Sequence, residues 1–429
     1  MKRVLILLCF ISAQLAAQQS LNLQDAVNIA LKNSLDIQLA KNDVQVNDVL
    51  NSYSVAGGLP VVNGSAASTE SVPSVNQKLN TGTTIQRNAA ATNNTSFGVS
   101  GSILLFNGYR VVATKNRLEE LEKQSQQVLN LQIQNVIGGV MTGYYDIVRQ
   151  QNYLKTINQS IDVAQQKLTI IETQQSVGLA NNADLFQAQL DLNTLQQTKQ
   201  SQLLVIDQAK TELLRLMTLK PDSAIAIQDT IIVDRDLKLD DILSKIPGNA
   251  DVLAQQEQVR INELIAKETA ALRYPSISAT AGYNYSRNQT AAGNVLFNQN
   301  YGPNVGLSLS VPIYNGANKR RQRAAEIDTR SAEVQRQALL RDYNASVVKN
   351  YQGYVTTLQQ LETEQKNFEL AQQLLNLVFQ RFQLRAATIV DFTLAQQSFE
   401  ESAYRLVNLS FAAKAAEIEL KRLANVLTF

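Results

Sequence analysis

Two hydrophobic periodicities alternate along the chain, and each predicts a different kind of element. Apolar or aromatic side chains occupy the odd positions of 277–285 and 305–313, with small residues between them. The same alternation places apolar side chains at Phe97, Val99, Ile103 and Leu105. A period of two predicts strands, here at about 60–70, 96–106, 274–286 and 304–314, the first of which is patterned poorly. The Gly-, Asn- and Thr-rich stretches 71–94 and 287–300 predict loops.

A spacing of three and four residues runs through much of the remaining chain and predicts long helices with a coiled-coil seam. Ten positions from Leu185 to Leu216 follow this spacing, and eight of them are apolar. The seam recurs 207 residues later, from Phe392 to Leu423. The predicted long helices are 109–173, 184–218, 316–381 and 389–424. No proline interrupts the first or the third, and a helix of roughly 65 residues would be about 100 Å long.

The recurring seam is one sign of an internal duplication. Phe106-Asn107-Gly108 recurs as Tyr314-Asn315-Gly316, and Asp184 recurs as Asp391. We therefore predict a first structural repeat over 18–218, an inter-repeat linker over 219–245 and a second repeat over 246–429. Each repeat is expected to contain an opening helix, two strands and two long helices, in that order.

The first residues, 1–17, predict a secretory signal peptide. Lys2 and Arg3 precede an apolar run, and small residues follow it at Ala16 and Ala17. Cys9 lies inside the run behind Leu8, a context that argues against a lipid anchor. The mature chain would be exported and free of disulfides. No later segment holds the ~18 continuous apolar residues of a membrane-spanning helix, so contact with a membrane would have to use strands.

Composition excludes several classes of function. The chain has no histidine, no tryptophan and a single cysteine, which removes histidine-dependent triads, most zinc sites and iron–sulfur ligation. A formal charge of +2 offers no basic surface to a nucleic acid. Phosphate-binding loops, HExxH and paired CxxC motifs are missing from the sequence. We expect no enzymatic activity, no cofactor and no resident metal.

Strands of about ten alternating residues suit a tilted strand of an outer-membrane barrel. A half-buried sheet in a soluble protein would show the same alternation, but the signal peptide and the long helices favour the membrane. Four strands cannot close a barrel, and open edges in hydrocarbon would leave backbone groups unpaired. Protomers would then have to share a barrel, and three copies would supply twelve strands around a water-filled lumen.

From about Leu21 to Leu423 the chain resembles the TolC-like outer-membrane efflux proteins. The resemblance rests on the opening LNLQDAVNIALKNSLDIQLA, the duplicated FNG and YNG, and the segments VGLANNADLFQA and ATIVDFTLA. It implies an α+β membrane protein: a trimeric twelve-stranded β-barrel, four strands per protomer, continued by a long periplasmic α-helical coiled-coil barrel. It also implies an exit duct of a tripartite efflux pump or a type I secretion system. The implied partners are a membrane-fusion adaptor, an inner-membrane transporter and outer-membrane lipid.

The resemblance also points to residues at the far turns of the helix pairs. Asp391 matches the first acid of the periplasmic aperture, where three copies would attract cations, but the second acid of that pattern is Leu394 here. The alternative is that Asp391, like Asp184, caps the helix that follows it. Asp184 matches a residue that locks the closed state through a tyrosine and an arginine, positions that hold Phe382 and Ala387 in this chain.

Two arginines are candidates to replace the missing lock. Arg385 occupies a position usually held by glycine, and Arg381 lies one turn earlier. We hypothesise that one of them pairs with Asp184, with a solvated arginine at the turn as the alternative.

The adaptor-facing tips are matched by Val177, Gly178 and Leu179, and by Arg385 in the second repeat. A plain helix C-cap at Gly178 is the competing account.

The basic run 319–323 follows the last predicted strand, where it would reach phospholipid headgroups on the periplasmic side. A solvated start of a helix is the alternative.

Together these features predict a passive outer-membrane duct for small toxic solutes or polypeptide, with the cargo chosen by its partners. The competing hypotheses are an exported coiled-coil protein of the cell envelope without a pore, and a secreted binding module or enzyme whose site the sequence does not contain.

Overall fold

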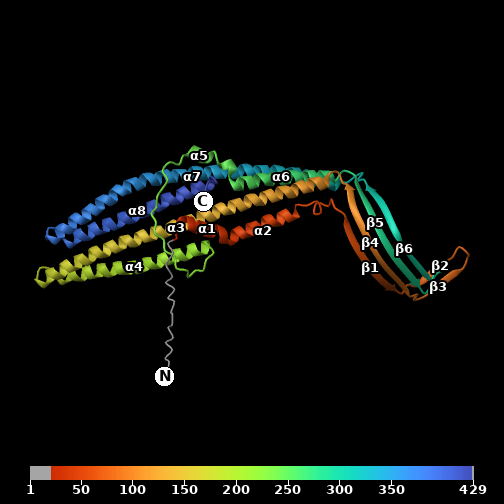
Figure 1. The fold of residues 1–429 in the computed structure, drawn as a ribbon, viewed down its shortest axis with the longest axis horizontal. Coiled ribbons are helices and arrows are strands. Elements are labelled where there is room, and N and C mark those ends of the chain that lie inside the picture. Colours follow the sequence, from red (N-terminus) through yellow and green to blue (C-terminus); the bar gives the residue numbers. More distant parts are fainter. Residues whose placement is uncertain (1–20, 428–429) are drawn as a thin grey trace, which may run out of the picture. The chain divides into compact units, whose positions relative to one another are not determined.

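The computed structural model describes residues 21–427, and the predicted signal peptide, 1–17, lies outside this range. The first repeat forms α1 (Leu23–Asn33), α2 (Leu35–Leu50), β1 (Val61–Ser71), β2 (Val75–Lys78), β3 (Thr84–Arg87), β4 (Thr92–Phe106), α3 (Arg110–Ser176) and α4 (Asn182–Leu216). The remaining chain forms α5 (Leu239–Leu243), the 3-10 helix η1 (Ile246–Gly248), α6 (Ala250–Ala271), β5 (Ser276–Thr290), β6 (Phe297–Ser310), α7 (Gly316–Gln383) and α8 (Ile389–Leu423). Figure 1 colours these elements along the chain from red to blue.

Some expectations about the elements are wrong. The first repeat opens with two helices rather than one, because the backbone of Ser34 leaves the helical conformation between α1 and α2. The expected linker contains α5, and Pro247 in η1 separates α5 from α6. The stretch 71–94 holds the β2–β3 hairpin, and much of 287–300 is strand. Apolar residues such as Val75, Ile85 and Phe297 do not alternate regularly with polar ones in these stretches, so a period of two does not mark the strands there. The last strand stops at Ser310 instead of 314.

The described chain forms two compact units, and each repeat contributes to both. We call residues 42–127 and 253–338 the sheet unit, and residues 21–41, 128–252 and 339–427 the coil unit. The boundaries fall inside α2, α3, α6 and α7. The two units are therefore joined by continuous helices and do not coincide with the two sequence repeats.

The sheet unit contains an antiparallel sheet with the strand order β1-β4-β5-β6. β4 of the first repeat pairs with β5 of the second from Thr92 to Phe106, so the sheet is built across the repeat boundary. The register brings the apolar positions of neighbouring strands opposite one another, as where Phe97 faces Tyr285. β1 and β6 are the two edges of the sheet.

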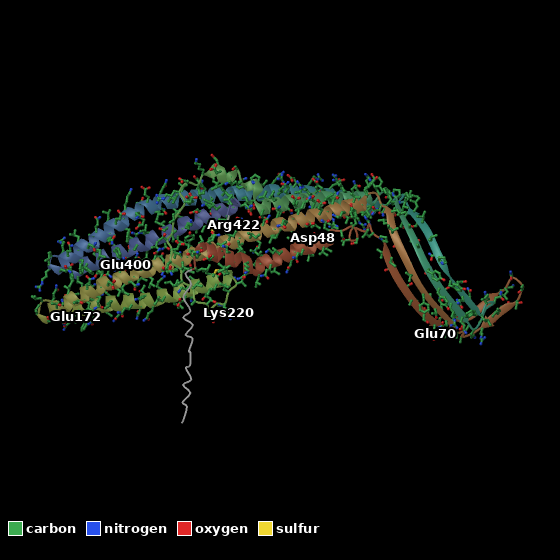
Figure 2. All side chains as sticks on the ribbon, in the orientation of Figure 1. Asp48, Glu70, Glu172, Lys220, Glu400 and Arg422 are labelled. Carbon is green, nitrogen blue, oxygen red and sulfur yellow. The ribbon has the colours of Figure 1, made fainter. Side chains whose placement is uncertain are left out.

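Neither face of this sheet is covered within the protomer. No residue of its four strands is buried, and Figure 2 shows side chains on both sides of the ribbon, with Glu70 labelled on β1. On the apolar face, Val305 and Leu307 are 85% and 76% exposed. On the polar face, the Asn284 amide donates to Asn304 Oδ1 over 2.8 Å. A half-buried sheet of a soluble domain would instead pack its apolar face on a core.

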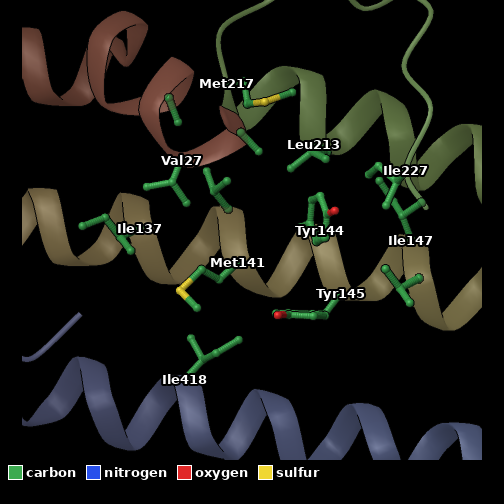
Figure 3. Close-up of a cluster of buried hydrophobic side chains, with 14 of the residues drawn as sticks. Val27, Ile137, Met141, Tyr144, Tyr145, Ile147, Leu213, Met217, Ile227 and Ile418 are labelled. Carbon is green, nitrogen blue, oxygen red and sulfur yellow. The ribbon is translucent and has the colours of Figure 1, made fainter. Parts of the chain in front are cut away.

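The main core of the coil unit forms where α1 and α4 pack on the middle of α3 (Figure 3). Val27 of α1, Tyr144 of α3 and Leu213 of α4 are at most 1% exposed. The Tyr144 hydroxyl lies 3.2 Å from the Asp229 carboxylate. Burial and this neighbouring negative charge raise the pKa of Tyr144, so its hydroxyl remains a proton donor. Ile418 of α8 completes the cluster from another side of α3.

The segment after α4 is held on the coil unit by a network of charges. The Asp234 backbone N–H donates to Glu417 Oε2 over 2.9 Å. Lys421 bridges the two acids, 2.9 Å from Asp234 and 2.8 Å from Glu417. Burial lowers the pKa of Lys421, but hydrogen bonds and charge from the two carboxylates outweigh it and raise the pKa above its usual value. The Tyr354 hydroxyl also donates to the Asp234 carbonyl.

Three polar residues in the predicted helix seams, Gln202, Glu364 and Ser402, have hydrogen-bond partners within the coil unit. Glu364 of α7 and Ser402 of α8 replace apolar residues of the first repeat, and the Ser402 hydroxyl donates to Glu364 over 2.6 Å. Burial pushes the pKa of Glu364 upward, but hydrogen bonds from Ser402 and Arg405 prevail and lower it. In α4, Gln202 donates to the carbonyl and side-chain oxygens of Gln150, at 3.0 and 2.9 Å.

The far turns of the long helices repeat the same backbone geometry 207 residues apart. Helices α3 and α7 both end in a Schellman motif, in which two N–H groups beyond the helix return to its last carbonyls. Leu179 donates to Gln174 O and Ala386 donates to Arg381 O, each over 2.7 Å. The residue that must be left-handed is Gly178 in the first motif, with φ of 74°, and Arg385 in the second, with φ of 59°.

We expect Gly178→Ala to lower the free energy of unfolding of the coil unit by roughly 1 kcal/mol, because a β-carbon disfavours the left-handed conformation. Arg385→Gly should raise it by a similar amount for the same reason. Gly353→Ala is the matched control, since it adds a methyl group in open space inside α7 and should stabilise by up to about 1 kcal/mol. Urea unfolding in detergent, followed by far-ultraviolet circular dichroism, measures all three. Destabilisation by both Gly→Ala changes would contradict the C-cap account.

Candidate functional site

The two far turns rest on one apolar cluster of the coil unit, to which α3, α4, α7 and α8 all contribute. Phe392 of α8 is wholly buried at its centre. The ring of Phe382, the residue at the expected lock-tyrosine position, lies 5.4 Å from the Phe392 ring. Phe382 is itself 5% exposed. An aromatic ring at this position therefore packs in the protomer core and offers no hydroxyl to Asp184.

Asp391 supports the start of α8 from inside the helix. The N-cap residue is Thr388, and Asp391 is the acid of a capping box with it. The Asp391 carboxylate accepts from the Thr388 backbone N–H at 2.9 Å and from its hydroxyl at 2.8 Å. Asp391 is therefore not the N-cap residue, contrary to the expectation from the sequence. It lies three residues later, where its carboxylate completes the capping box. The backbone and side-chain hydrogen bonds from Thr388 lower the pKa of Asp391, so the exposed carboxylate stays charged into more acidic solution than usual.

Asp184 occupies the corresponding position in α4 with a different partner. Its backbone N–H donates to Oδ1 of the N-cap residue Asn181 over 2.8 Å, so Asp184 is not the N-cap either. Its carboxylate has no hydrogen bond or ion pair with any residue in 21–427. Position 181 is Asn and position 388 is Thr, so the two repeats reach the same helix start through different side chains.

The predicted pairing of an arginine with Asp184 does not form within the protomer. The Arg381 guanidinium donates instead to the Ala386 carbonyl over 2.9 Å, where it supports the C-cap of α7. Arg385 stands at the left-handed position of the same turn, and within 21–427 its side chain contacts no acid. Within the described residues, neither the Asp184 carboxylate nor the Arg385 guanidinium therefore has an oppositely charged partner.

The expected adaptor-facing residues are exposed at the turn of the first pair. Val177 and Leu179 are 62% and 56% exposed, on either side of Gly178. Leu384 corresponds to Val177 in the second repeat and is 80% exposed. Gly178 also serves as the C-cap of α3, so the capping account holds for this residue.

A buried lysine lies near the tips, at a position that the sequence analysis did not single out. Lys167 of α3 has no exposed surface. Its ammonium group lies 2.7 Å from Asp191 Oδ2 of α4 and 3.4 Å from Thr393 Oγ1 of α8. Its nitrogen also lies 5.5 Å from the centre of the Phe392 ring, on the face that attracts cations. One buried charge thereby connects α4 and α8 through α3.

Sequence repetition offers a signal for this lysine. The residues equivalent to Lys167 and Asp191 in the second repeat are Leu374 and Ser398, so the pair is absent there. Lys167 lies beside the seam, where a charged residue is normally assigned to solvent. Lys167 and Asp191 are both replaced by uncharged residues in the second repeat, and this shared change indicates that they interact. The burial of the lysine is evident only from the packing of the helices.

Among the described residues, no group of three or more His, Cys, Asp or Glu side chains is arranged to hold a metal ion. No helix within 21–427 combines the length and the apolarity needed to cross a membrane.

We expect Asp191→Asn to lower the free energy of unfolding by roughly 2–3 kcal/mol, because it leaves the Lys167 charge buried without a counter-ion. Lys167→Met should cost less than about 1.5 kcal/mol, since Asp191 is partly exposed and still accepts from Gln187 over 2.7 Å. The double variant should resemble Lys167→Met, a non-additive result that a double-mutant cycle measures by urea unfolding. Additive losses would show that the pair is not coupled.

Comparison with known proteins agrees with this geometry. Residues 26–219 and 246–426 match the model of the family described as outer membrane efflux protein. The pyoverdine export outer membrane protein OpmQ of Pseudomonas aeruginosa is 24% identical over 344 residues, which cover 76% of this chain and 68% of that protein. Toxin and drug export protein A of Aggregatibacter actinomycetemcomitans is 23% identical over 401 residues, covering 92% and 84%.

A solved structure shares the fold. The outer membrane channel CmeC of Campylobacter jejuni superposes with a TM-score of 0.77 at 16% identity, covering 94% of this chain and 85% of that one. The two family matches fall on the two repeats and leave out most of the segment between them. The chain belongs to the outer membrane efflux protein family and resides in the outer membrane, with its helical part in the periplasm.

Proposed function

We propose that three copies of this chain form one outer-membrane duct, in which twelve strands close a β-barrel and the long helices continue the lumen into the periplasm. The observation that carries the proposal is the sheet of the sheet unit. Both of its faces are exposed in the protomer, and both of its edges lack a partner strand. Such a sheet cannot be complete in a single copy.

The two faces suit the two environments of a barrel wall. The apolar face, which includes Val99, Tyr283 and Leu307, would meet lipid, and the Ser- and Asn-rich face would meet water. β5 has 15 residues, whereas a tilted strand needs only ~9–11 to cross the hydrocarbon. The extra residues near the β2–β3 hairpin are polar on both faces, as expected of strands that extend beyond the membrane.

The edges explain why the barrel would be shared. Each backbone N–H or C=O left unpaired in hydrocarbon costs roughly several kcal/mol, and β1 and β6 each present a row of them. Pairing β6 of one protomer with β1 of the next, three times around, would satisfy both rows. Twelve strands make a barrel wide enough for a water-filled lumen.

The cargo would be small toxic solutes or polypeptide, conducted passively and supplied by an inner-membrane transporter through a periplasmic adaptor. The names of the relatives support export, since they specify pyoverdine export and toxin and drug export. The exposed apolar residues Val177, Leu179 and Leu384 are the proposed adaptor contacts. Unequal turns, with Gly178 in one and Arg385 in the other, would give the adaptor two different docking positions.

At the periplasmic aperture we assign different roles to the two acids. Three copies of Asp391 would form a charged ring, for which its lowered pKa keeps the carboxylates ionised. Asp184, whose carboxylate has no partner within the described protomer, would pair with Arg385 or Arg381 of a neighbouring copy in the closed state. The cap of α8 and the ring charge can be separated, because an asparagine at position 391 retains an acceptor for the Thr388 N–H.

We expect the mature full-length protein, purified in detergent, to have three times the mass of one chain by light scattering. Heating should dissociate it, because the shared barrel is not covalent. In planar lipid bilayers it should give discrete single-channel conductance. A coiled-coil envelope protein without a pore predicts no conductance at any concentration, and the heat-dissociated sample is the matched negative control.

Two aperture variants should have different effects in the same bilayer measurement. Asp184→Ala should raise the conductance of the resting channel, because it removes one partner of the proposed lock. Asp391→Asn should leave that conductance near the parental value but reduce the preference for cations, measured as a shift of reversal potential in a salt gradient. An Asp184→Ala channel no leakier than the parent would exclude the lock, and an unshifted reversal potential in Asp391→Asn would exclude the ring.

A further inference from the structure

A cavity of about 850 Å³ in the sheet unit is lined by residues at the end of α6 and residues between β6 and the first turns of α7. Figure 1 shows that these two segments lie at the same end of the sheet. Arg273 follows α6, and Lys319 and Arg323 lie in the first turns of α7. Glu326 is the one acid among the residues that line the cavity. All of these residues belong to the sheet unit.

Positive charge in the cavity is not balanced within the protomer. Glu326 pairs with Arg323 at 3.0 Å. Among the described residues, the Arg273 guanidinium has one polar partner, the hydroxyl of the neighbouring Tyr274, whose ring centre lies 5.3 Å from the guanidinium carbon. The Lys319 ammonium has no hydrogen bond or ion pair within 21–427. Two cations therefore face an open cavity without a carboxylate for either.

The position of these cations is electrostatically unfavourable unless an anion is present. The N-terminal end of a helix carries a partial positive charge that favours acids, yet Lys319, Arg320, Arg321 and Arg323 all fall within the first eight residues of α7. Three of these four cations have no counterpart in the first repeat, whereas Arg323 corresponds to Lys115. The residues equivalent to Lys319, Arg320 and Arg321 after the FNG of the first repeat are Val111, Val112 and Ala113.

The rim of the cavity combines this charge with exposed apolar groups. Ile313 and Tyr314 line the cavity and are 97% and 91% exposed. Tyrosine is enriched where membrane proteins pass from hydrocarbon to headgroup, because its ring is apolar and its hydroxyl is polar. The protein resides in the outer membrane with its helices in the periplasm, so the end of β6 that leads into α7 is the periplasmic end. The cavity thus lies at the level of the periplasmic headgroups.

We propose that this cavity binds the headgroup of an acidic phospholipid from the periplasmic leaflet of the outer membrane. Arg273 and Lys319 contact the phosphate, and Ile313 and Tyr314 contact the start of the acyl chains. The charge of the site matches a lipid with a net negative headgroup, whereas a zwitterionic lipid brings its own cation to a cavity that already contains two cations without a carboxylate partner.

The full-length protein in a neutral detergent is mixed with dioctanoyl phosphatidylglycerol, and the lipid retained per chain is counted by native mass spectrometry. Dioctanoyl phosphatidylcholine and inorganic phosphate are the comparison ligands. The test variant is Arg273→Gln/Lys319→Gln, which leaves the Arg323–Glu326 pair in place. The matched control is Arg341→Gln/Lys349→Gln, which removes two exposed cations of α7 outside the cavity. Size-exclusion chromatography confirms that the three proteins have the same assembly state.

The parent and the control should retain phosphatidylglycerol at least threefold more than phosphatidylcholine, and the test variant should lose at least two thirds of it. Higher salt should weaken the difference, because it screens the charges.

Equal retention of both lipids by the parent, or equal loss in both variants, would overturn the proposal. Displacement of the lipid by millimolar phosphate would assign the site to a free anion instead. If the parent retains no lipid and only the test variant loses its assembly state, a neighbouring chain fills the cavity and the proposal is wrong. Because binding is counted without measuring current, the result does not depend on the proposed conduction.

Discussion

β1 and β6 each present a row of backbone N–H and C=O groups that find no partner inside the protomer. In water such edges are satisfied by solvent, but in hydrocarbon each unpaired group is costly enough to decide the architecture. The rest of the sheet is consistent with that constraint. Its apolar face is uncovered, its polar face is uncovered, and the hydrophobic clusters of the described chain lie in the coil unit. Within the described residues, the buried hydrophobic clusters therefore belong to the helices, while the sheet remains open at both edges.

The duplicated helices show how one backbone plan carries two different chemistries. The ends of α3 and α7, and the starts of α4 and α8, correspond at a constant offset of 207 residues. At equivalent positions the side chains diverge: Lys167 and Asp191 form a buried pair where the second repeat has Leu374 and Ser398. Glu364 and Ser402 form a hydrogen bond where the first repeat has apolar residues. Packing shape is conserved between the repeats, whereas the polar contacts that orient the hairpins are specific to each.

Asp391 and Asp184 illustrate the limit of residue-by-residue inference at the tips. Both occupy the first turn of a helix, as a capping role would require, but the caps are Thr388 and Asn181. The Asp391 carboxylate returns to its cap, and that of Asp184 has no partner in the described protomer. A pattern of Asp before an apolar heptad is compatible with either arrangement. In both helices the cap side chain accepts the N–H of the aspartate three residues later, so the two arrangements differ only in whether the carboxylate accepts from the cap residue in return.

Periodicity along the chain was sufficient to predict the long helices and three strands of the sheet with their apolar faces, whereas the first strand was patterned poorly. These properties depend on the order of side chains along one element, which a linear sequence records directly. The sequence could not predict that β4 and β5 pair across the repeat boundary, that both repeats contribute to each compact unit, or that Lys167 is wholly buried. Those features depend on which distant elements pack together, because burial and pairing belong to contacts between segments and not to any segment alone.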